Sequence, residues 1–294
     1  MKSNITAKLV LLPTIVAIAV FVYGFIIYTV RLSFSNWNSL IKDMSFVGLK
    51  NYKDVFKSFR FQSDIRNMIC YTVLFISVTI ILGMIIAIVL DKGLKGTGFF
   101  RMTFLIPMAI SAVVTGVAWR WILNSEAGVN ILFHWNLKWY TDTTVLPSLK
   151  VGNIELGFPV AILGLVIAAF WQMSGFAITN FLSGLAGISE EVKEAARVDG
   201  ASKWVIYTKI IVPMMKPVIL SVFILMFQIS LKVFDLIYTM TGSGPNYVTD
   251  MPAINMYETT FRGMFYAQGA VIAVCMLLIV AAFVIPYQLL SRKE

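Results

Sequence analysis

Charged and reactive side chains are scarce in this sequence of 294 residues. Only 13% of the residues are charged and 59% are hydrophobic, a balance that excludes a soluble globular domain. The single histidine, His134, cannot form a zinc site, which needs about three or four such ligands. The two cysteines, Cys70 and Cys275, lie far apart in apolar runs and form neither a CxxC pair nor a disulfide framework. We therefore expect an integral membrane protein.

Catalytic motifs are also missing from the sequence. It contains no HExxH, GxSxG or GxxxxGK[ST] pattern. The glycine-rich stretch Gly93–Phe100 has the wrong residue order for a phosphate loop, and we expect a tight turn between two membrane spans there. We expect no catalytic residue, metal or cofactor in this chain, so any energy for its work must come from another protein.

Long apolar runs dominate the rest of the chain. Six of them can cross a hydrocarbon layer ~30 Å thick as helices of about 20 residues. They are Leu9–Val30, Met68–Leu90, Met102–Leu123, Phe158–Leu182, Val218–Met240 and Ala267–Leu290. The first is too long for a signal peptide and lacks a cleavage site, so we interpret it as a retained span. The sequence predicts one all-α membrane domain over residues 1–294, with six transmembrane helices.

Lysine and arginine are denser in the segments that would be cytoplasmic if the N-terminus is inside, although the segment after the first span is also basic. This density favours an N-in, C-in orientation. The aromatic stretch around His134, ILFHWNLKWY, predicts an interfacial helix between the third and fourth spans.

One charged segment, 189–213, interrupts the apolar pattern between the fourth and fifth spans. Ser189 is a good N-cap with acidic residues following it, and Gly200 is a natural C-cap, so a helix of about ten residues is expected between them. Val192, Ala195 and Ala196 are expected to share a narrow face. A second helix capped by Ser202 would follow. The pattern is typical of a docking helix, and a solvated interfacial hairpin is the alternative.

The same segment resembles the EAA loop of permease subunits in binding-protein-dependent ABC importers. The matching residues are Glu194, Ala195, Ala196, Gly200, Ile210 and Pro213, and Val212 stands where the family usually has leucine. The stretches LSFSNW, FVGLKNY, GFFRMTFLIPMAIS, GVAWRWIL and VFDLIYTMTGSGP are similar to the maltose-type sugar permeases in particular.

The resemblance implies a type I ABC importer permease fold in the cytoplasmic membrane of a bacterium or archaeon. It implies a carbohydrate as substrate, a second permease subunit in a heterodimer, an extracytoplasmic sugar-binding protein and two ATP-binding cassette subunits that hold ATP and Mg. It also implies that the charged helix couples the chain to the ATPase. The coupling residues carried over are Glu190, Glu191, Glu194, Ala195, Ala196, Arg197, Asp199 and Gly200.

Candidate substrate contacts are the polar residues inside the spans, where such side chains are costly. In the fifth span Gln228, Lys232, Asp235 and Thr239 would fall on one helical face, with Ser230 beside it. Lys232 and Asp235 form either part of the site or a structural ion pair. In the fourth span the candidates are Trp171, Gln172, Ser174 and Phe176, and the resemblance supports Phe176 and Ser230 most.

Two other functional classes stay open at this point. An ion-coupled secondary transporter of a small polar solute would also place polar residues at the midplane, but such proteins usually show inverted repeats and coupling carboxylates, and no repeat is found here. A membrane-embedded enzyme would need a catalytic constellation, and no such set is present in the sequence. Both alternatives predict work without an ATPase partner.

Overall fold

The computed structural model describes residues 2–91, 96–151 and 154–291, and these group into two compact units. One unit contains residues 1–62 and 252–294, and the other contains 63–251. The predicted turn at Gly93–Phe100 lies partly outside the described residues. The expectation of one domain over the whole chain stays a prediction.

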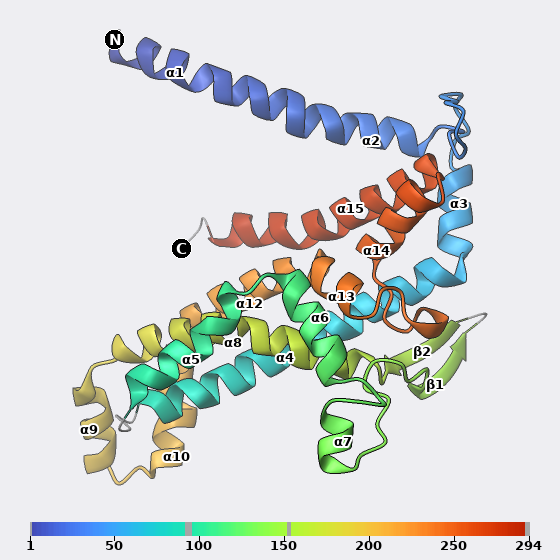
Figure 1. The fold of residues 1–294 in the computed structure, drawn as a ribbon. Coiled ribbons are helices and arrows are strands. Elements are labelled where there is room, and N and C mark those ends of the chain that lie inside the picture. The colour runs from blue at the N-terminus through green and yellow to red at the C-terminus, as the bar shows by residue number, and fades with distance from the viewer. Residues whose placement is uncertain (1, 92–95, 152–153, 292–294) are drawn as a thin grey trace. The chain divides into compact units, whose positions relative to one another are not determined.

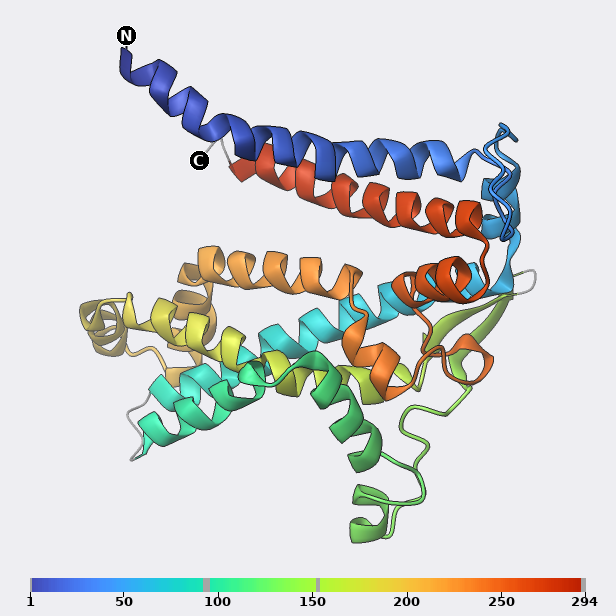
Figure 2. The same ribbon diagram turned by 45° about the horizontal axis from the view of Figure 1, so that its top comes forward.

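The first unit consists of helices from both ends of the chain (Figure 1). Its elements are α1 (Lys2–Ile18), the π-helical turn η1 (Ala19–Gly24), α2 (Phe25–Ser33), α3 (Lys50–Lys57), α14 (Pro252–Tyr257), the π-helical turn η4 (Glu258–Arg262) and α15 (Tyr266–Ser291). The helix α2 packs along α15 (Figure 2). Asn51 fixes the connection after α2, because its side-chain amide donates to the carbonyls of Ser33 and Ser35 at 3.0 and 2.7 Å.

The second unit contains the remaining elements. They are α4 (Phe59–Asp91), α5 (Thr97–Ala109), α6 (Ala112–Ile122), α7 (Val129–Phe133), β1 (Val145–Val151), β2 (Ile154–Pro159), α8 (Ile162–Ala186), α9 (Glu190–Val198), α10 (Lys203–Val205), the π-helical turn η2 (Ile206–Ile211), α11 (Val212–Met214), α12 (Lys216–Leu231), α13 (Asp235–Met240) and the 3₁₀ turn η3 (Pro245–Tyr247). The first residues of α4 belong to the other unit. The core of this unit lies along α8, where Ile162, Leu165 and Phe181 are fully buried.

Four described helices are long and apolar enough to cross a membrane, and two further spans are bent pairs of helices. The unbent ones include Val10–Ser33, Phe59–Asp91 and Ile162–Ala186. The pair α5 and α6 bends by 103°, and the pair from Lys203 to Leu231 bends by 65° where the sequence places Pro213 and Pro217. Counting each bent pair as one span gives up to six, in agreement with the sequence prediction.

The structure corrects three local predictions. β1 and β2 form an antiparallel hairpin that an all-α prediction left out, so the fourth span begins at Ile162 and not at Phe158. The predicted interfacial helix around His134 is only the short α7, because His134 adopts a left-handed backbone with φ +54° and ends it. The third span is not straight, since α5 ends after Pro107 and Ser111 caps α6 by accepting a hydrogen bond from the Val114 amide at 3.3 Å.

Candidate functional site: the coupling segment and a cavity between spans

The charged helix predicted from the sequence is present as α9. Ser189 takes the extended N-cap conformation, but its hydroxyl makes no capping bond, so only part of the predicted cap is confirmed. At the other end Gly200 has φ +77°, and the Ala201 amide donates to the Ala196 carbonyl at 3.0 Å. That bond is typical of a helix ending in a left-handed glycine. Among the described residues, no atom beyond its chain neighbours lies within 4 Å of a Cβ built on Gly200, so a methyl group there would strain the backbone without clashing with them.

The two alanines of the predicted narrow face point in different directions. Ala196 is 7% exposed and packs inward, while Ala195 is exposed. The outward face of α9 is formed by residues three and four apart, which follow the helical period. It consists of Glu191, Glu194, Ala195 and Val198, with Val198 87% exposed. The surface that another protein can contact therefore combines the two carboxylates of Glu191 and Glu194 with the apolar side chains of Ala195 and Val198.

The inward side of α9 carries a chain of charges. The Lys193 ammonium lies 3.0 Å from a Glu190 carboxylate oxygen and 3.7 Å from Oδ2 of Asp91 at the end of α4. Arg197 contacts the other Glu190 oxygen at 3.0 Å. Together with Lys203 these residues line a cavity of about 490 Å³, which we call the charged cavity.

The pKa values of this charge chain follow from its contacts. Hydrogen bonds from Lys193 and Arg197 and their positive charges hold the pKa of Glu190 below its usual value. Burial of Lys193 opposes its charge, but the hydrogen bond to Glu190 and the charges of Asp91 and Glu190 outweigh it and raise its pKa. The lowered pKa of Glu190 and the raised pKa of Lys193 both favour the charged forms of these two side chains near neutral pH.

The second predicted helix of the segment is also present, in a modified form. Ser202 accepts a hydrogen bond from the Val205 amide at 3.4 Å, as its expected role as N-cap requires. The helix α10 then passes into the π-helical turn η2, which ends at the fully buried Ile211. Trp204 is 77% exposed. The segment therefore presents an exposed indole in addition to the outward face of α9.

The fifth span breaks where the sequence predicted a continuous polar stripe. The helix α12 ends at Leu231, Phe234 has φ −134° and ψ −66°, and α13 begins at Asp235. Gln228, Lys232, Asp235 and Thr239 therefore do not share the face of one helix, and that prediction is wrong. Among the ion pairs of the described residues, none joins Lys232 to Asp235, and both side chains are exposed.

The break nevertheless places three of the predicted residues together. Gln172, Lys232 and Asp235 line a cavity of about 250 Å³, which we call the span cavity. Tyr71 and Phe75 of α4 line this cavity as buried rings, stacked on each other with centroids 5.6 Å apart. The Gln172 amide donates to the Ile110 carbonyl at 3.0 Å, at the bend between α5 and α6. The span cavity thus combines ring surfaces with an amide, an ammonium and a carboxylate.

The other predicted contacts lie outside the lining of this cavity. Ser230 is fully buried and donates to the Phe227 carbonyl at 2.9 Å, and Ser174 is 3% exposed and donates to the Trp171 carbonyl at 3.0 Å. Trp171 packs edge-on against Trp119. Phe176 and Gln228 are half-buried. Both serine hydroxyls are thus used inside their own helices in this conformation.

A buried polar clamp near the start of α4 was missed in the sequence. The side-chain amide of Asn67 donates to the carbonyls of Tyr247 and Asp250 at 2.7 and 3.0 Å, and its oxygen accepts from Arg66 at 2.9 Å. Asn67 is fully buried, and Arg66 is 9% exposed. A polar pair just before an apolar run is the signal that could have indicated this clamp.

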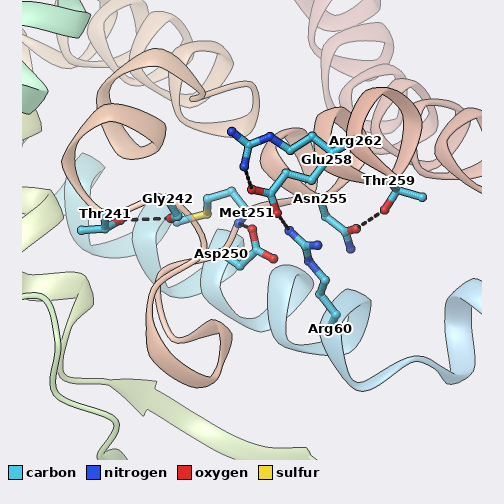
Figure 3. A network of polar contacts seen from close by, with 9 residues as sticks. All are labelled: Arg60, Thr241, Gly242, Asp250, Met251, Asn255, Glu258, Thr259 and Arg262. Atoms are coloured by element: carbon cyan, nitrogen blue, oxygen red, sulfur yellow. Dashed lines mark hydrogen bonds and ion pairs between the residues drawn. The ribbon is translucent and has the colours of Figure 1, made fainter. Parts of the chain in front are cut away.

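Polar contacts also organise the segments that follow this clamp (Figure 3). Asp250 accepts a hydrogen bond from the Met251 amide at 3.0 Å. In the other unit, Glu258 pairs with Arg60 at 2.6 Å and with Arg262 at 3.4 Å, which ties η4 to the first turn of α4. These carboxylates therefore serve local structure in both units.

Comparisons with known proteins identify relatives along nearly the whole chain. A probable ABC transporter permease protein of Pyrococcus horikoshii is 36% identical over 97% of this chain and 95% of its own. The xylose/arabinose import permease protein of Haloferax volcanii is 32% identical, covering 95% of this chain and 86% of its own. The trehalose/maltose transport system permease protein of Thermococcus litoralis is 30% identical, covering 99% of both chains.

Solved structures support the same fold. A chain of a bacterial ABC transporter that imports the acidic polysaccharide alginate matches with a TM-score of 0.80 at 19% identity, over 99% of this chain and 96% of that one. The predicted type I importer permease fold is thereby confirmed. Residues 79–294 match the family described as binding-protein-dependent transport system inner membrane component. The chain belongs to this family of membrane permease subunits.

Proposed function

We propose that this chain is the permease subunit of an ABC importer for a carbohydrate and forms one half of its translocation pathway. Two relatives are named for the import of xylose or arabinose and of trehalose or maltose, which supports a sugar as the substrate. A solved importer of the same fold carries alginate, which is also a carbohydrate. The likeness of these relatives along almost the whole chain is the observation that carries the proposal.

The span cavity is the proposed sugar contact within this half of the pathway. Sugars present hydroxyl edges that hydrogen-bond and apolar faces that pack on aromatic rings, and this cavity offers both kinds of partner. Gln172, Lys232 and Asp235 are the proposed hydrogen-bonding groups, and Tyr71 and Phe75 the ring surfaces. A second permease subunit would supply the other half of the site.

Energy for import is proposed to reach the chain through α9. The outward face of Glu191, Glu194, Ala195 and Val198 fits a cleft on an ATP-binding cassette subunit, which would hold ATP and Mg. Two such subunits and an external sugar-binding protein complete the proposed assembly. The solved alginate importer is recorded with a periplasmic protein that binds alginate, which supports this last partner. We place the assembly in a bacterial or archaeal cytoplasmic membrane with both chain ends inside.

The test is to purify the tagged chain from membranes of its own host in mild detergent and to reconstitute it into vesicles. We expect a nucleotide-binding subunit to copurify, and ATP to drive accumulation of a sugar presented with its binding protein. The matched variant is Glu194→Lys, which reverses one charge of the outward face and should lower sugar-stimulated ATP hydrolysis while the chain still inserts. Uptake driven by an ion gradient without ATP would overturn the proposal and favour a secondary transporter.

A further inference from the structure

The coupling helix α9 buries little of its surface against the rest of its unit. Ala196 is its one buried residue among those described, so apolar packing anchors it weakly. The pairs that Glu190 makes with Lys193 and Arg197 stay within α9. Among the ion pairs of the described residues, Lys193 with Asp91 is the one that joins α9 to a membrane span.

The position of Asp91 explains why it needs a cation. An acidic side chain at the C-terminal end of a helix faces the negative end of the helix dipole, which is unfavourable. The Lys193 ammonium lies 3.7 Å from Asp91 and offsets both charges. The side chains of Lys193 and Asp91 are only 13% and 21% exposed, so water screens this pair less than the more exposed pair of Arg197 with Glu190.

The helix that contains Asp91, α4, is long and has no proline. It runs from Phe59 to Asp91 without a proline, so it lacks the commonest cause of a sharp kink. Asn67, near its beginning, holds the carbonyls of Tyr247 and Asp250. At 1.5 Å per residue, Asn67 and Asp91 lie roughly 36 Å apart along the helix. A displacement at Asp91 would therefore reach the 241–251 loop on the far side of the same unit.

We propose that Lys193 and Asp91 form a strut through which movement of the coupling helix is transmitted to α4 during transport. Both are positioning residues: they contact neither the sugar nor the nucleotide, and they act by fixing α9 to the end of a span. The strut rests on the proposed function, because it transmits movement only if an ATPase subunit displaces α9.

The test is a double-mutant cycle in the reconstituted importer. Asp91→Asn removes the link to α4 but leaves the pair of Lys193 with Glu190, and Lys193→Met keeps the apolar stem and removes the ammonium. The control is Lys209→Met, which removes an exposed lysine from the same segment without an ion pair among the described residues. Complex yield, ATP hydrolysis and sugar uptake per ATP hydrolysed are measured for each variant.

We expect normal complex yield and ATP hydrolysis for Asp91→Asn, with uptake per ATP lowered about threefold to tenfold, a range consistent with coupled contact pairs. Lys193→Met should act similarly, and the double variant should be no worse than either single one. The strut would be overturned if the losses of the two single variants multiply in the double variant. It would also be overturned if Asp91→Asn keeps the parent's sugar uptake per ATP hydrolysed. If Lys193→Met fails to assemble, Asp91→Asn decides alone. A parent complex that copurifies with no ATPase overturns the proposed function itself, and the strut with it.

Discussion

The coupling segment 189–213 and the 241–251 loop are both polar interruptions of one helical unit, and they are stabilised in opposite ways. The coupling segment exposes every charged side chain except that of Lys193 and buries only Ala196, Ile206 and Ile211. The 241–251 loop buries every residue from Val248 to Met251 and is held by the amide of Asn67. Both contact α4, one at Asp91 and the other near its start.

The difference shows how each segment can move. The pairs of Glu190 with Lys193 and Arg197 stay within α9 and little of this helix is buried, so α9 can shift as its outward face docks and carry Asp91 with it through Lys193. Buried hydrogen bonds are costly to leave unmade, so a loop held by them moves with the helix that clamps it. One segment is thus suited to receive a movement and the other to follow it.

The largest expected effect concerns which side of the membrane each segment faces. In a background without Cys70 and Cys275, a thiol introduced by Ser202→Cys should react only with a membrane-permeant reagent, and one introduced by Asn246→Cys should react with an impermeant reagent added outside. Both side chains are exposed, so an all-or-none contrast is expected. Labelling of intact cells followed by mass spectrometry measures it.

Two neighbouring positions serve as controls for this labelling. Lys209→Cys avoids the capping role of Ser202, and Pro245→Cys avoids the left-handed backbone of Asn246. Equal access to both segments from one side would refute the comparison, since α4 could not then separate them across a membrane.

A smaller but still severe effect is expected from Asn67→Ala. The change removes two donors to backbone carbonyls and one acceptor for Arg66 inside a buried site, which we expect to cost ~3–5 kcal/mol of folding stability. The thermal unfolding midpoint and the yield of monodisperse protein measure this loss. Asn67→Asp keeps an acceptor for Arg66 but cannot donate to Tyr247 and Asp250, so it separates the two halves of the clamp. An unchanged midpoint for Asn67→Ala would mean that the loop does not depend on the clamp.

The sequence predicted the elements whose signals are local. Apolar length located the spans, and the residues around Ser189 and Gly200 located α9, because capping and helix dipoles act within one turn. It did not predict the break before Asp235, since apolar residues flank Lys232 and a polar stripe at helical spacing assumes an unbroken helix. It also missed the contacts of Asn67 with Tyr247 and Asp250 and of Asp91 with Lys193, whose members lie at least a hundred residues apart in the chain. Such contacts are set by tertiary packing, which one sequence does not encode locally.

The smallest expected effect separates backbone strain from docking at Gly200. The left-handed backbone at φ +77° disfavours a side chain, so Gly200→Ala should cost about 1 kcal/mol of stability. Asparagine tolerates this conformation, so Gly200→Asn should unfold close to the parent temperature. No atom of the described residues beyond its chain neighbours lies within 4 Å of a Cβ added at Gly200, so a loss of ATP hydrolysis without a loss of stability in Gly200→Asn would indicate contact with a partner. We expect Gly200→Asn to fold normally and to lower sugar-stimulated ATP hydrolysis. If its hydrolysis equals that of the parent, the docking surface excludes Gly200 and is limited to the outward face from Glu191 to Val198.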